Sequence, residues 1–178
     1  ICCINCIACS SNNSENTTPT ETTDNSVEMK TNLKEAVTNM LDCAVLCEDI
    51  IEAIIDVWDP SDNGEIYYID YIFDSSKPIH VHDMVQELYI QDARESLTNL
   101  EDTHSLFEKS NKKMIHWPDS MKEEKELYEK LYDAYLNLYQ LATSPSGNFM
   151  TYTSNANDCI AEFSTQFQKI APNSFICC

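Results

Sequence analysis

The sequence predicts an all-α fold, a four-helix up-down bundle, on two observations. Four segments carry apolar residues at alternating spacings of three and four, which places them along one stripe of a helix. Glycine makes up only 2 of the 178 residues, far below the usual share of about 7%, and this scarcity disfavours tight hairpins and β-sandwiches. The bundle is expected over residues 27–172, followed by a short tail at 173–178.

The first helix is expected to end near Trp58 and to form a seam of the bundle. Its apolar stripe runs for more than seven turns through Leu33, Val37, Met40, Ala44, Cys47, Ile51, Ile54 and Trp58. A second helix is expected over residues 81–111. Its stripe is less regular and contains Val85, Leu88, Ala93, Leu97, Leu100, His104 and Phe107.

The third helix is expected from Pro118 to Ala142, because proline is favoured in a first helical turn and acidic residues follow it. Apolar residues on this helix are joined by a tyrosine row, Tyr128, Tyr132, Tyr135 and Tyr139. Pro145 and Gly147 then break the helix. The fourth helix should end near Pro172, and its stripe is Thr153, Ala156, Ile160, Phe163, Phe167 and Ile170.

Short connections favour antiparallel neighbours, but the first connection is long. Residues 59–78 lack helical periodicity, although Ile66–Phe73 is apolar and aromatic enough to form an extra helical turn or a strand. A loop of this length inside a domain is usually functional or mobile.

Residues 59–70 of this loop are similar to an EF-hand calcium loop. Asp59, Ser61 and Asn63 occupy the first three side-chain ligand places. Gly64 stands at the sharp turn and Ile66 at the usual apolar place. Asp70 stands at the twelfth place, where it is shorter than the usual Glu, and Tyr67 replaces a polar residue. An ordinary acidic turn is the alternative interpretation, so calcium is a secondary hypothesis and no other cofactor is expected.

The N-terminus carries a second motif. Ile7-Ala8-Cys9 closes an apolar run and is followed by a polar tract up to Ser26. This boundary resembles the lipobox of bacterial lipoproteins, although Cys6 stands where Leu is usual. The resemblance implies that residues 1–9 are the remnant of a signal peptide, that Cys9 carries a lipid, and that residues 10–26 form a disordered tether. The domain would then sit on the extracellular face of the cell membrane. The alternative is a secreted protein with disulfides among Cys2, Cys3 and Cys6.

The helical region resembles domains of uncharacterised lipoproteins of Gram-positive bacteria. The similar features are Ile54-x-x-x-Trp58, the Leu-Tyr motifs from Tyr128 to Tyr139, the break at residues 145–147 and the aromatic last helix. The resemblance implies no known activity.

Composition limits the partners. Thirty acidic and 11 basic side chains give a formal net charge of -19, which repels nucleic acids and anionic membranes. We therefore expect a non-enzymatic module that binds another macromolecule, such as a protein, or has a structural role in the cell envelope. The tyrosine row and the long loop are its candidate contact surface.

Histidine and cysteine offer few catalytic candidates. We expect His80, His82 and Asp83 at a solvated helix start, with a metal site as the alternative. His104 is expected in the core, and His116 is expected at the surface. Glu101 and His104 form the only Glu-x-x-His pair, whereas a di-iron bundle needs two. Core packing is expected for Cys43, Cys47 and Cys159, although either of the first two might reach Cys159 in a disulfide.

Overall fold

The computed structural model describes residues 25–58, 69–77 and 84–175, and most of these residues are helical. The α-helices are α1 (Ser26–Val57), α2 (Ile69–Phe73), α3 (Met84–Asn111), α4 (Lys122–Thr143) and α5 (Phe149–Phe175), and a 3-10 helix, η3 (Asp119–Met121), precedes α4. No β-strand occurs in these three ranges. The predicted all-α class is confirmed.

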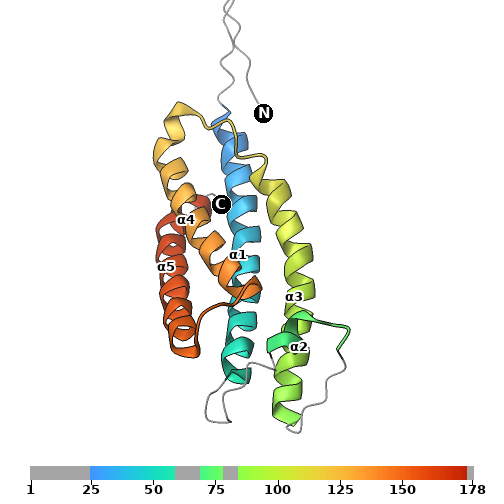
Figure 1. Ribbon diagram of the computed structural model, residues 1–178. Helices are drawn as coiled ribbons and strands as arrows, with labels where there is room; N and C mark the ends of the chain where they lie inside the picture. Colours follow the sequence, from blue (N-terminus) through green and yellow to red (C-terminus); the bar gives the residue numbers. More distant parts are fainter. Residues whose placement is uncertain (1–24, 59–68, 78–83, 176–178) are drawn as a thin grey trace, which may run out of the picture.

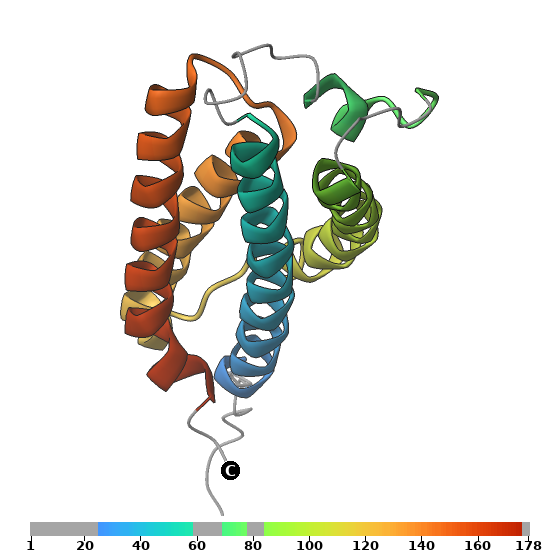
Figure 2. The same cartoon turned by 90° about the horizontal axis from the view of Figure 1, so that it is seen from below.

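Helix α1 lies in the middle of the molecule. Figures 1 and 2 show α3 on one side of α1 and α4 and α5 on the other, and α1 packs against all three. Neighbours on two sides bury more than one stripe of α1, so Ile50 and Ala53 are buried besides the predicted seam. The up-down order of the four long helices stays a prediction.

All eight residues predicted for the seam of the first helix are buried. Trp58 directly follows the helix, and its ring centroid lies 5.5 Å from that of Tyr152 and 6.3 Å from that of Phe149. The C-terminal end of α1 therefore packs against the start of α5. Cys43, which the periodicity placed beside the stripe, is fully buried, because the stripe is wider than one seam.

The stripe of α3 differs from the prediction at its start. Ile90 is fully buried, whereas Leu88, which we expected to face inward, is 56% exposed. The regular alternation of three and four begins at Ile90 and continues through Ala93, Leu97 and Leu100. Leu88 lies two positions before Ile90, which is about 200° around the helix, and therefore faces solvent.

The tyrosine row of α4 faces the core, which corrects the expectation that it forms a contact surface. Tyr135 is fully buried and Tyr128 is 4% exposed. The Tyr135 ring lies 5.0 Å from that of Phe107 on α3, in an edge-on arrangement. The row is inward because α4 packs against α1 and α5, and its rings also reach His104 and Phe107 of α3.

The ends of α4 and α5 follow the proline and glycine signals in part. Pro118 precedes η3, and Gly147 has a positive φ of 94° at the break between α4 and α5. Helix α5, however, contains Pro172 and continues to Phe175, past its expected end. A proline so close to a helix terminus removes one hydrogen bond from the last turns and leaves the rest of the helix unaffected.

Helix α2 supplies the extra helical turn that was one of two alternatives for Ile66–Phe73. Ile69 and Ile72 are buried, and Arg94 of α3 fixes the segment that follows. Its Nε donates to the carbonyl oxygen of Tyr71 at 2.7 Å, and one Nη donates to those of Asp74 and Lys77 at 2.8 and 3.0 Å. The full course of the long connection stays a prediction.

Candidate functional site

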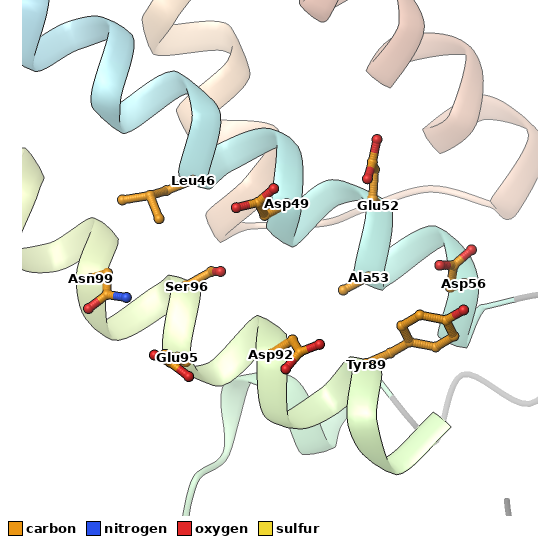
Figure 3. A pocket seen from close by; sticks show the side chains of 10 residues that line it. All are labelled: Leu46, Asp49, Glu52, Ala53, Asp56, Tyr89, Asp92, Glu95, Ser96 and Asn99. Atoms are coloured by element: carbon orange, nitrogen blue, oxygen red, sulfur yellow. The ribbon is translucent and has the colours of Figure 1, made fainter. Parts of the chain in front are cut away.

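A groove of about 470 Å³ lies between α1 and α3 (Figure 3). Two rows of side chains line it, one from each helix. They are Leu46, Asp49, Glu52, Ala53 and Asp56 from α1, and Tyr89, Asp92, Glu95, Ser96 and Asn99 from α3. Apolar and aromatic side chains therefore share the groove with five carboxylates.

The two rows follow from helical spacing. On α1, Asp49, Glu52 and Asp56 are separated by three and four residues, so they share one face beside the buried seam. On α3, Asp92 and Glu95 are separated by three residues in the same way. Because α1 and α3 pack side by side, these two acidic edges border the groove, although the Glu52 carboxylate points away from α3 in Figure 3.

The groove is strongly acidic. None of its lining residues is basic, and none of the ion pairs among the described residues includes one of its carboxylates. Burial raises the pKa of the neighbouring Glu48, and the charges of Glu52 and Asp49 raise it further. Since five exposed carboxylates line the groove, a cationic group placed in it would be attracted to several of them at once.

The lining of the groove contains no histidine, cysteine or lysine, and its titratable groups are the five carboxylates and the Tyr89 hydroxyl. Within the described ranges, no three His, Cys, Asp or Glu side chains lie close enough together to hold a metal ion. The arrangement is suited to electrostatic binding of a positively charged group.

Most residues of the predicted calcium site lie outside the described residues. This applies to Asp59, Ser61 and Asn63, and it applies to Gly64 as well. Asp70 lies in the first turn of α2, and its carboxylate accepts a hydrogen bond from Lys77 Nζ at 3.2 Å. The predicted lipidation site, Cys9, also lies outside the described residues.

His104 occupies the core position that its spacing predicted. Its Nδ1 lies 2.7 Å from the Tyr135 hydroxyl, and its ring stacks on that of Tyr139 with centroids 4.4 Å apart. The side chain is 25% exposed, so it lies at the edge of the core. His116 is exposed as expected, whereas His80 and His82, with Asp83, lie outside the described residues.

The three cysteines of the helical region are free thiols. Core packing is confirmed for Cys43 and Cys47, which are fully buried, whereas Cys159 is only partly buried. Burial raises the pKa of Cys43 to about 11, and it also raises the pKa of Cys47. The Tyr135 hydroxyl that contacts His104 also hydrogen-bonds Cys43. Both buried thiols are protonated at neutral pH, and a protonated thiol is a weak nucleophile.

Sequence reasoning missed the acidic groove and the role of Arg94. Acidic pairs are so frequent in this chain that we interpreted them as solvated helix faces. The signal was the spacing of Asp49, Glu52 and Asp56 directly beside the buried seam of the first helix. For Arg94, the signal was that it is the single arginine of the sequence.

Comparison of the chain with protein families, curated proteins and solved structures finds no significant match. None of the described helices is both long and apolar enough to cross a membrane. The functional argument therefore depends on the geometry of the chain itself.

Proposed function

We propose that this chain is a non-enzymatic helical module that binds a positively charged segment of another macromolecule in the groove between α1 and α3. The observation that carries this proposal is the set of five carboxylates that line the groove without a basic partner. A segment with several lysines or arginines would place cations between the two acidic rows.

The physical advantage of such a partner is electrostatic. With a net charge of -19, the chain attracts cationic partners over a distance of about one Debye length, roughly 8–10 Å at moderate salt. Complementary charge mainly raises the association rate and the specificity. Leu46 and the partly exposed ring of Tyr89 add apolar contact area for the methylene groups of lysine or arginine.

The surroundings of the module are also part of the proposal. The four long helices form an up-down bundle, the polar residues between Cys9 and the start of α1 tether it, and a lipid on Cys9 holds it at the extracellular face of the membrane. What supports this placement is the Ile7-Ala8-Cys9 boundary and the polar tract that follows it. A secreted form without the lipid is the alternative.

Charge reversal tests the groove. In the double variant Glu52→Lys and Asp92→Lys, we expect the affinity for a fluorescein-labelled Lys/Ala peptide to fall about tenfold, because two exposed charge pairs are worth about 1–2 kcal/mol in total. Fluorescence anisotropy measures this change. For the unmodified chain, the affinity should fall as salt is added.

A matched control separates the effect of the groove on affinity from the effect of net charge. Glu126→Lys with Asp133→Lys changes the net charge equally, but both residues lie on the exposed face of α4. This control should retain most of the affinity. If both double variants weaken binding equally, or if a Glu/Ala peptide binds as well as the Lys/Ala peptide, the groove is not the binding site.

A second candidate function is calcium binding by residues 59–70. The observation that favours it is the position of the flanking helices, since α1 ends at Val57 and α2 begins at Ile69. A twelve-residue segment from Asp59 to Asp70 would thus begin just after one helix and end in the first turn of the next, as in an EF-hand.

A further inference from the structure

A second cavity, of about 440 Å³, lies where α2, α3 and the C-terminal end of α4 meet. Its apolar lining includes Ile72, Leu97 and Leu100, and the rings of Phe73 and Tyr139 complete the apolar part. This volume is within the range of roughly 300–1,000 Å³ typical of small-ligand sites. The cavity is separate from the acidic groove, because the two share no lining residue.

Two opposite charges mark this cavity. Arg94 and Glu101 are its only charged lining residues, so its formal charge is zero, unlike that of the acidic groove. They stand seven residues apart on α3 and therefore on the same helix face. At a rise of about 1.5 Å per residue, their positions are roughly 10.5 Å apart along the helix axis.

Neither charge is neutralised by an ion pair within the described ranges. Arg94 donates to three backbone carbonyl groups and forms no ion pair with a carboxylate of the described residues. The carboxylate of Asp74 accepts hydrogen bonds from Ser76, which lower its pKa, and the nearby charges of Lys77 and Arg94 lower it further.

The lining of the cavity also offers hydrogen-bond acceptors. The hydroxyls of Thr98 and Thr143 donate to the carbonyl oxygens of Arg94 and Tyr139, at 3.0 and 2.8 Å. Since each hydroxyl hydrogen is used in this way, both oxygens present lone pairs, which accept hydrogen bonds from N–H groups.

We propose that this cavity binds a short peptide of about three residues with free termini. Its C-terminal carboxylate would lie at Arg94 and its N-terminal ammonium group at Glu101. Three extended residues span at most roughly 10–11 Å, which is similar to the roughly 10.5 Å between the backbone positions of Arg94 and Glu101 along the axis of α3. The threonine hydroxyls accept from peptide N–H groups, and the apolar lining contacts the peptide side chains.

Isothermal titration calorimetry of the whole chain with trialanine tests this proposal. Blocking either terminus, in N-acetyl-trialanine or trialanine amide, should weaken binding about two- to fivefold, as expected for one exposed charge pair. Alanine alone should bind more weakly than trialanine. Absence of trialanine binding up to about 10 mM, or equal binding of free and blocked forms, would overturn the proposal.

The variant Glu101→Gln tests whether Glu101 binds the N-terminal ammonium group of the peptide. Glu101 is exposed, so the substitution should leave the fold intact. We expect it to weaken binding of trialanine about two- to fivefold but to leave binding of N-acetyl-trialanine unchanged, because that peptide has no ammonium group. The control Asp102→Asn, at an exposed position of the same helix that lines neither this cavity nor the acidic groove, should change neither. An equal effect of both variants would show that the loss is not specific to this cavity and would refute the assignment.

Discussion

Replacing Arg94 by lysine tests how α2 and the turn after it are held to α3. The variant keeps the positive charge but loses the planar fork that donates to the carbonyl oxygens of Tyr71, Asp74 and Lys77. A hydrogen bond to a charged group contributes about 1.5–3 kcal/mol. The three bonds share one half-buried side chain and are not additive, so we expect a total loss near that range.

This loss should appear as local opening of residues 69–77. Ile69 and Ile72 remain buried and hold the segment in part, and the long helices retain their own packing. A change of about 1.5–3 kcal/mol accelerates amide exchange by roughly 10- to 150-fold. The informative amides are those of Asp74 and Lys77, which donate to the carbonyl oxygens of Asp70 and Asp74.

Hydrogen–deuterium exchange read by NMR measures this effect. The melting temperature should change by only a few degrees, because the segment opens without unfolding the long helices. Lys109→Ala serves as a control, since it removes an exposed positive charge from the same helix and should leave both amides unchanged. Unchanged exchange at Asp74 and Lys77 in the Arg94→Lys variant would refute the reasoning.

Four further predictions concern the core, the thiols, the loop and the N-terminus. Ile51→Ala should lower the free energy of unfolding by about 2–5 kcal/mol in chemical denaturation, because Ile51 is fully buried. The control is Val27→Ala, at a position that is 74% exposed. An equally small change in both variants would contradict the core position of Ile51. Burial raises the pKa of Cys43 from 9.0 to about 11, so the free energy of unfolding should fall as pH rises through this interval. The fall should be smaller in the Cys43→Ala variant. An equal fall in both proteins would exclude Cys43 as a cause. Calcium at about 10 mM should raise the melting temperature more than magnesium does, and Asp59→Ala should abolish the difference; equal shifts with both ions would indicate an ordinary acidic loop. Mass spectrometry of the mature exported protein should find a lipid on Cys9, and unmodified residues upstream of it would disprove the anchor.

Much of the helical structure could be predicted from the sequence, because the 3.6-residue period is a local property. The seam from Leu33 to Trp58 was correct at every position. The error at Leu88 has the same local origin, since a stripe with few apolar residues is compatible with two registers. Burial of Ile90 in the core decides between them, and a single helix does not contain that information.

The candidate sites were harder to predict. Two carboxylates become part of one groove only when α1 and α3 pack side by side, and the spacing within either helix cannot place Asp49 opposite Asp92. The same applies to the second cavity, where Tyr139 of α4 lies opposite Leu97 of α3. In both places the residues are distant in sequence, so no local pattern joins them.

The sequence by itself determined the helical class, the strong negative charge and most of the residues that face the core, because composition and periodicity are sufficient for these properties. Only the tertiary structure decided that the tyrosine row faces the core and that Arg94 holds the end of α2. It also decided which carboxylates share a groove. These features depend on which helices pack together, and packing is a property of pairs of surfaces that no single helix encodes.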